Sequence, residues 1–326
     1  MSQPVTRPDR LPEGVSVVVP VFNSEDSLAD LVAGLGRVLP TVARRFELIL
    51  VNDGSGDGSW RKVEELAASQ PWVVGIDLVR NFGQHNALLC GIRAARFRVV
   101  VTMDDDLQHP PEEVPRLLER LAEGFDVVYG PPIDPEHDLP RNLASLVSRM
   151  VLKTAMGVEH GRHASSFRAF RTSVRNGFAG YNGPFVCLDA LLTWGASRFS
   201  HVPVRHEPRS QGHSNYTVAK LLGVAFNMMT GFSVRPLRAA SLMGFAFSLF
   251  GGLVLVYVVG RYVIEGGSVP GFPFLASIIA ILSGVQLLAL GVIGEYLARM
   301  HFRLMDRPPY VAREVSGGEG TVRNPG

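Results

Sequence analysis

The chain has 326 residues, which is long for one average domain and sufficient for two. Hydrophobic residues make up 46% of it and charged residues 19%, so the composition excludes a disordered tail protein and a coiled coil. The net charge is +2 and no sustained basic stripe is present, so we expect no nucleic-acid partner. The two cysteines, Cys90 and Cys187, are too few for a disulfide framework or a zinc cluster, and we expect both in the core.

The first 235 residues alternate short β-branched runs with helical segments. This pattern predicts an α/β domain with a parallel sheet covered on both faces. Strands are expected at Val15–Phe22, Phe46–Val51, Val73–Val79 and Arg98–Met103, and helices near Gln84–Arg96 and Pro111–Ala122. In such sheets ligands bind at the carboxyl ends of the strands. Three polar clusters follow expected strands and predict a site at that edge: Pro20–Asn23, Asn52–Ser55 and Asp104–Gln108.

Three adjacent carboxylates, Asp104, Asp105 and Asp106, follow the fourth expected strand directly. They repel one another, and a divalent cation would remove the cost of holding them together. Hard oxygen ligands suit Mg²⁺ or Mn²⁺. In an extended segment Asp104 and Asp106 point to one side and Asp105 to the other, and Gln108 is the next oxygen ligand on the first side. The alternative is a solvated loop that caps the helix beginning near Pro111.

Two apolar runs near the C-terminus, Ala239–Gly260 and Gly266–Gly294, contain no charged residue. Each exceeds the roughly 20 residues that a helix needs to cross about 30 Å of hydrocarbon. We therefore expect a transmembrane hairpin, with helices over about 239–264 and 274–297. A pair of buried core helices is the alternative.

Arginines on both outer ends of this hairpin set its expected orientation. By the positive-inside rule both ends face the cytoplasm, and the first 14 residues lack the apolar core of a signal peptide. We expect a multi-pass protein of the inner (plasma) membrane with a cytoplasmic catalytic domain. The expected order is a soluble domain over 1–235, the hairpin over 236–300 and a cytoplasmic tail over 301–326, disordered after Pro308.

Seven short segments, in this order and with this spacing, form a recognisable set: Pro20–Asn23, Val51–Ser55, Arg80–Ala87, Asp104–Glu112, Ser166–Arg168, Arg209–Tyr216 and Gly294–Tyr296. Together with the hairpin they resemble the family 2 glycosyltransferases of the GT-A fold, specifically the polyprenyl-phosphate glycosyltransferases. These include dolichol-phosphate mannose synthases and undecaprenyl-phosphate glucosyl- and aminoarabinosyltransferases. The resemblance covers nearly the whole chain. It implies a GT-A domain with a Rossmann-like mixed sheet, followed by a two-helix membrane hairpin.

The resemblance also implies an inverting, metal-dependent transfer of a sugar to a polyprenyl (undecaprenyl or decaprenyl) phosphate. The donor would be a nucleotide sugar, expected to be UDP-linked, and Asp53 would accept hydrogen bonds from its base or ribose. Arg209 would approach the diphosphate from a loop that Gly212 lets close. The residues expected to bind the donor are Pro20, Phe22, Asn23, Asp53, Asp104, Asp105, Arg209 and Ser214.

Mg²⁺ or Mn²⁺ is the expected cofactor. The family's metal motif maps onto Asp106 and Gln108, with Asp104 close to the metal and the sugar. Arg168 corresponds to an arginine that contacts phosphate, here that of the acceptor lipid; a plain ion pair with a carboxylate is its alternative. A phosphate monoester is already anionic, so the nucleophile needs no strong general base. The expected catalytic residues are Asp104, Asp106, Arg168 and Arg209.

The family usually has an arginine shortly after the fifth strand, but here Pro131 and Pro132 occupy that place. Arg141 is a candidate substitute for the missing arginine. The roles of Glu25 and His85 are left open, with capping or packing the favoured interpretation of His85. The segments 143–156 and 217–232 are expected to lie as interfacial helices on the membrane. We also expect a homo-oligomer. Two alternatives stay open: a non-enzymatic donor-binding membrane subunit, and a glycosyltransferase whose hydroxyl acceptor would require a general base.

Overall fold

The structure is a computed structural model that describes residues 12–133, 163–183, 185–207, 234–265 and 271–318. The chain divides into two compact units. One comprises residues 1–221 together with 307–326, and the other comprises residues 222–306.

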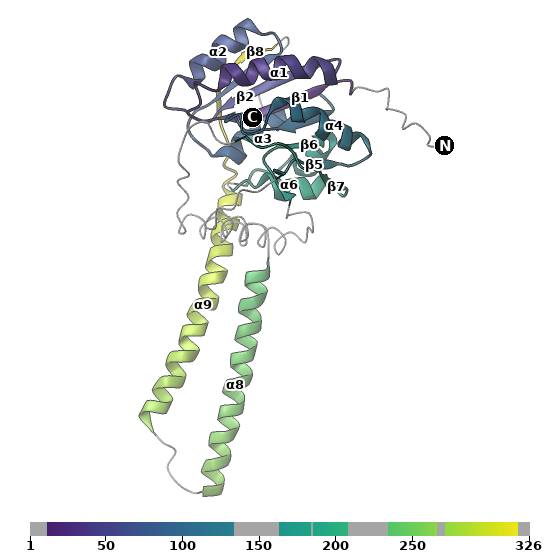
Figure 1. Cartoon of the computed structure of the whole chain (residues 1–326). Helices are drawn as coiled ribbons and strands as arrows, with labels where there is room; N and C mark the ends of the chain where they lie inside the picture. Colours follow the sequence, from purple (N-terminus) through teal and green to yellow (C-terminus); the bar gives the residue numbers. More distant parts are fainter. Residues whose placement is uncertain (1–11, 134–162, 184, 208–233, 266–270, 319–326) are drawn as a thin grey trace, which may run out of the picture. The chain divides into compact units, whose positions relative to one another are not determined.

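The first unit is built on an eight-stranded sheet with the strand order β7-β5-β6-β4-β1-β2-β3-β8 (Figure 1). Strands β4, β1, β2 and β3 run parallel, whereas β6 is antiparallel to β4 and β5, and β8 is antiparallel to β3. The sheet is therefore mixed, as the resemblance implied, and not parallel throughout. The strands are β1 (Val15–Val21), β2 (Phe46–Asn52), β3 (Val73–Leu78), β4 (Val99–Thr102), β5 (Val127–Tyr129), β6 (Arg168–Arg171), β7 (Phe199–His201) and β8 (Ala312–Gly317).

Helices cover both faces of this sheet, which is why its central strands are almost continuously apolar. Alternate residues of β1, such as Val17 and Val19, pack into a core with α1 and α4. Val18 faces the other way, toward α3, and the approach there is so close that a Cβ on Gly91 would lie 2.4 Å from Val18 Cγ1. The helices are α1 (Leu28–Val42), α2 (Ser59–Ser69), α3 (Gln84–Ala94), α4 (Val114–Ala122) and α6 (Leu188–Gly195), with 3-10 turns η1 (Pro111–Glu113) and η3 (Thr172–Phe178).

The four predicted strands are confirmed to within two residues, and both cysteines are free and buried as predicted. Burial raises the pKa of each thiol to about 12, which keeps both thiols protonated and unreactive at neutral pH.

The prediction that the chain is disordered after Pro308 is wrong for the described residues. Tyr310 is 4% exposed, and its hydroxyl accepts a hydrogen bond from Arg93 Nη1 at 3.4 Å. The residues that follow form β8, which pairs with β3 through a register shift at Asp77 and Leu78. The segment has little apolar content of its own, and its order comes from a strand more than 200 residues earlier.

The second unit contains α8 (Arg235–Glu265) and α9 (Phe272–Leu304), two long apolar helices (Figure 1). Two stretches are long and apolar enough to cross a membrane: Arg235–Ile264, with mean hydropathy 2.3, and Ile281–Leu304, with mean hydropathy 1.6. No side chain in the apolar windows of these stretches is buried within the structure, which contradicts the core-helix alternative. Within α9, Glu295 and Arg299 form an ion pair four residues apart, at 2.6 Å.

Candidate active site

The three predicted polar clusters meet at the carboxyl edge of the sheet. The amide nitrogen of Phe22, directly after β1, donates to Asp105 Oδ2 at 3.1 Å, and this links the first cluster to the carboxylate triplet after β4. The amide nitrogen of Asn23 donates to Ser55 Oγ at 3.1 Å, and this links the first cluster to the loop after β2. Phe22 is 49% exposed, so an aromatic ring is available to a ligand at this edge, whereas Pro20 is buried inside β1.

Asp53 lies where it was predicted, but both of its oxygens already have partners in the protein. Oδ1 accepts from the amide nitrogen of Phe82 at 2.7 Å and Oδ2 from that of Gly83 at 2.8 Å, at the start of α3. Burial raises the pKa of Asp53, and these two hydrogen bonds oppose the rise. The carboxylate therefore fixes the loop before α3, a role that the sequence did not reveal.

The carboxylates of the triplet point to different partners. Asp104 Oδ2 accepts from Ser166 Oγ at 2.5 Å and Oδ1 from Gln84 Nε2 at 2.7 Å, while Asp105 bonds to the loop after β1. This agrees with the prediction that Asp104 and Asp105 face opposite ways. Burial raises the pKa of Asp104 to about 6; Ser166 opposes the rise, and the neighbouring charges of Asp106 and Asp105 add to it.

The segment after Asp104 is bent and not extended, so the alternation used to place Gln108 is wrong. Leu107 has a φ of +59°, in the left-handed region, and its partly buried side chain packs against the hydrophobic core. In this turn Asp106 Oδ1 accepts from the backbone nitrogen of Gln108 at 3.2 Å. The assignment of Asp106 and Gln108 to a metal stays a prediction that rests on the family motif.

Two histidines beside the triplet were not selected from the sequence. The rings of His109 and His206 lie 5.0 Å apart, and the Nδ1 atom of each is buried without a hydrogen-bond partner. Burial lowers the pKa of His109 to about 4. The neighbouring His206 also lowers this pKa, whereas the negative charge of Asp106 raises it. Unpartnered imidazole nitrogens beside repelling carboxylates are a donor set that suits a divalent cation. Among the described residues, however, no three His, Cys, Asp or Glu side chains already form a metal-binding group.

Arg168 is 2% exposed and forms an ion pair with Asp189, which also accepts from Tyr129 Oη at 3.1 Å. Arg168 is the first residue of β6. The structure therefore shows the alternative role of Arg168, an ion pair with a carboxylate. The contact of Arg168 with the acceptor phosphate stays a prediction. Nearby, His85 Nδ1 accepts from the amide nitrogen of Leu188 at 3.4 Å. Burial lowers the pKa of His85, in accord with the capping or packing interpretation.

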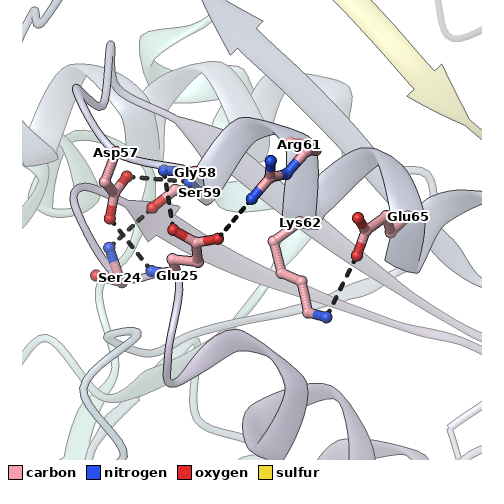
Figure 2. A network of polar contacts seen from close by, with 8 residues as sticks. All are labelled: Ser24, Glu25, Asp57, Gly58, Ser59, Arg61, Lys62 and Glu65. Carbon is pink, nitrogen blue, oxygen red and sulfur yellow. Dashed lines mark hydrogen bonds and ion pairs between the residues drawn. The ribbon is translucent and has the colours of Figure 1, made fainter.

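Glu25, whose role the sequence left open, accepts a hydrogen bond at the start of α2. Its Oε2 accepts from the amide nitrogen of Gly58 at 3.0 Å, and Oε1 pairs with Arg61 Nη2 at 3.0 Å (Figure 2). A Cβ on Gly58 would lie 2.3 Å from Glu25 Oε1, so the carboxylate would have to move to accommodate a larger residue. Asp57 and Ser59 extend the same network, so the loops after β1 and β2 are held together (Figure 2). Glu25, in the loop between β1 and α1, thus has a structural function.

The other predicted site features lie outside the described residues. They are Arg209, Gly212, Ser214, Arg141 and the segments 143–156 and 217–232.

Comparison with known proteins gives the geometry a context. Residues 16–173 match the family model "Glycosyl transferase family 2". The chain is 34% identical over 312 residues to an undecaprenyl-phosphate 4-deoxy-4-formamido-L-arabinose transferase of Shewanella sediminis, with 94% of each chain covered. Proteins of the same name from Pseudomonas aeruginosa and Yersinia pestis are 34% and 32% identical, covering 92% and 95% of this chain and 90% and 96% of theirs.

A solved structure supports the fold. Glucosyl-3-phosphoglycerate synthase from Mycobacterium tuberculosis, in complex with Mn²⁺, UDP-glucose and phosphoglyceric acid, superposes with a TM-score of 0.50 at 19% identity. The match covers 69% of this chain and 84% of the other. At this identity the likeness shows the fold alone. From the relatives and the fold together, the chain is a glycosyltransferase of family 2 with the GT-A fold, and it belongs with the undecaprenyl-phosphate sugar transferases.

Proposed function

We propose that this enzyme transfers a sugar from a nucleotide sugar, expected to be UDP-linked, to a polyprenyl phosphate. The observation that carries the proposal is the similarity over more than nine-tenths of the chain to transferases named for undecaprenyl phosphate. The site geometry supports it, because an exposed aromatic ring, several backbone loops and a carboxylate triplet meet at one edge of the sheet. This edge is where α/β folds bind nucleotides.

The residues on the donor side would act by holding the nucleotide and its diphosphate. Phe22 offers a ring face for the base, and Asn23 lies beside it on the same loop. Asp53 would act on the donor by fixing the loop before α3, given its two backbone hydrogen bonds. Arg209 and Ser214 are proposed to contact the diphosphate, where a guanidinium can pair with two oxygens at once.

The acceptor chemistry also favours a phosphate. Asp104 accepts hydrogen bonds from Ser166 and Gln84, and we assign it to the donor side of the site and not to a general base. A phosphate monoester needs no such base because it is anionic at neutral pH. Its oxygen would displace the nucleoside diphosphate directly from the anomeric carbon, which inverts the configuration there. Arg168 is proposed to act on the acceptor side of the site.

A divalent cation, Mg²⁺ or Mn²⁺, is proposed to be held by Asp106 and Gln108, with Asp104 nearby. When bound, it would neutralise charge on the diphosphate leaving group. The raised pKa of Asp104 and the unpartnered nitrogens of His109 and His206 fit a cation at this place.

We further propose that α8 and α9 cross the inner membrane as a multi-pass anchor and that the catalytic domain is cytoplasmic. Their length and hydropathy support this, as do the arginines on both outer ends. A phosphatase reporter fused to Gly326 is expected to stay inactive in cells, and a fluorescent reporter at the same place is expected to glow. An active phosphatase fusion would contradict this orientation.

The experiment that tests the function uses the purified full chain in detergent with undecaprenyl phosphate, Mg²⁺ and a panel of UDP-sugars. We expect one donor to yield a lipid-linked sugar phosphate together with UDP, and Asp106→Ala to abolish the reaction. Release of UDP without the lipid product would contradict the proposed acceptor. A product with diacylglycerol, or with a glycan hydroxyl, would favour the alternative acceptor class.

A further inference from the structure

The chain beyond the second apolar helix returns to the first unit and adds β8 to the sheet beside β3. On β8, Arg313 donates from Nη1 to Asp77 Oδ2 at 3.0 Å and from Nη2 to the carbonyl oxygen of Val79 at 2.9 Å. Asp77 is 3% exposed, and a buried carboxylate requires hydrogen-bond donors. A residue of the C-terminal strand therefore compensates a charge that is buried inside the sheet.

Asp77 in turn sets the direction of the hydrogen bonds in the loop after β2. Its Oδ1 accepts from Asn52 Nδ2 at 2.7 Å, so the side-chain oxygen of Asn52 faces the other way. That oxygen accepts from Ser55 Oγ at 2.6 Å. Because the hydroxyl proton of Ser55 is used there, its oxygen is left as the acceptor for the amide of Asn23 at 3.1 Å. Every direction in this chain follows from Asp77, since a carboxylate only accepts.

The hydrogen-bond chain ends at the loop expected to bind the nucleotide. Asn23 has a φ of +54°, in the left-handed region that asparagine adopts more readily than most residues with a side chain. Its amide is fixed by Ser55, and its Oδ1 accepts from the amide of Gly56 at 2.8 Å. The adjacent Phe22 carries the exposed ring at this edge. Ser55 therefore holds the backbone directly after this ring, while Asp105 holds the amide of Phe22 itself.

We propose that Arg313 is a positioning residue of the donor site, which fixes the backbone of Asn23 through a chain of hydrogen bonds formed by Asp77, Asn52 and Ser55. The inference rests on the proposed function, because it takes the loop after β1 as the nucleotide site. It makes β8 a working part of that site, although its residues follow the apolar hairpin in the sequence.

The test compares Arg313→Ala with Glu314→Ala in the full chain. Glu314 is the matched control because it is exposed and lies opposite Asp77 in the register, yet as a carboxylate it donates no hydrogen bond to Asp77. UDP is titrated calorimetrically in the presence of Mg²⁺, and hydrogen exchange is followed at residues 22–24 and 55–58. Since Arg313 is 59% exposed, we expect Arg313→Ala to weaken UDP binding about threefold to tenfold. In Arg313→Ala the amide hydrogen exchange of residues 22–24 and 55–58 should be faster. In Glu314→Ala, both the UDP affinity and the exchange should match those of the unmodified protein.

Arg313→Lys keeps the charge and should recover part of the affinity, which a general loss of β8 would not allow. Exchange of the β3 and β8 amides shows whether the strand remains paired in each variant. Unchanged UDP affinity and loop exchange in Arg313→Ala would overturn the proposal, as would an equal loss in Glu314→Ala. If the unmodified protein does not bind UDP, the proposed donor fails, and the exchange measurement still tests the positioning role.

Discussion

Replacing Asp53 with alanine separates two roles for this residue: a direct contact with the nucleotide and a support for the loop before α3. The structure shows its two oxygens bound to the amides of Phe82 and Gly83, at 2.7 and 2.8 Å. Removing the carboxylate leaves two donors without a partner at the start of a helix. Each would cost about 1–3 kcal/mol if fully buried.

These amides are half-buried, and water can replace part of the loss, so we expect a total of about 1.5–3 kcal/mol. In a domain of this size, that lowers the melting temperature by roughly 3–12 °C. Hydrogen exchange at Phe82 and Gly83 should accelerate by one to two orders of magnitude, because a factor of ten corresponds to about 1.4 kcal/mol.

The assay combines thermal unfolding of the detergent-solubilised chain with hydrogen exchange and UDP titration. Asp30→Ala is the control, since Asp30 is an exposed acidic residue in the first turn of α1. If Asp53→Ala keeps its melting temperature and the exchange of both amides, yet loses UDP binding, the supporting role is refuted. That outcome would favour the direct contact with base or ribose.

Three further predictions concern the metal, an ion pair and the acid limb of stability. Asp106→Ala, or excess EDTA, should reduce transfer by orders of magnitude while membrane insertion is kept, and full turnover in EDTA would remove the metal assignment. Arg168→Ala leaves the partly buried Asp189 unpaired and should destabilise the fold by about 3–5 kcal/mol, whereas an unchanged melting temperature with a raised lipid requirement would support the phosphate contact. Burial opposes ionisation of Asp126, but backbone hydrogen bonds from Arg198 and Ser197 outweigh it and lower the pKa of Asp126. Stability from this group is therefore present above its unfolded pKa near 3.9 and lost below it, so in unfolding measurements the deficit of Asp126→Asn should persist from pH 7 to about 4 and shrink only at lower pH.

Features that depend on local pattern were predictable from the sequence. The apolar runs of β1 to β4 fix their own positions because each is a short β-branched segment with polar ends. The convergence of Phe22, Asn52–Ser55 and the carboxylate triplet followed from one topological rule, that the carboxyl ends of parallel strands lie at one edge. The two apolar helices were predictable because each run is long enough to cross a membrane and contains no charged residue.

Features that depend on distant partners were not predictable. β8 is an edge strand whose order comes from β3, and Arg313 lies 236 residues from the carboxylate it compensates. The two oxygens of Asp53 accept hydrogen bonds from backbone amides 29 and 30 residues later. From its residue type we expected Asp53 to bind the nucleotide, whereas its contacts show that it supports the loop before α3. At Leu107 the backbone bends and the side chain packs against the core, and a pattern of alternating faces contains neither feature.

The most direct test of the account is the chemical state of the acceptor phosphorus after the reaction. Undecaprenyl phosphate, Mg²⁺ and the active UDP-sugar are incubated with the full chain, and the lipid fraction is followed by phosphorus NMR and mass spectrometry. The account predicts that the phosphate monoester of the lipid becomes a sugar-linked diester with inverted anomeric configuration, and that one UDP is released per lipid converted. An unchanged monoester signal alongside sugar transferred to a hydroxyl group would contradict it.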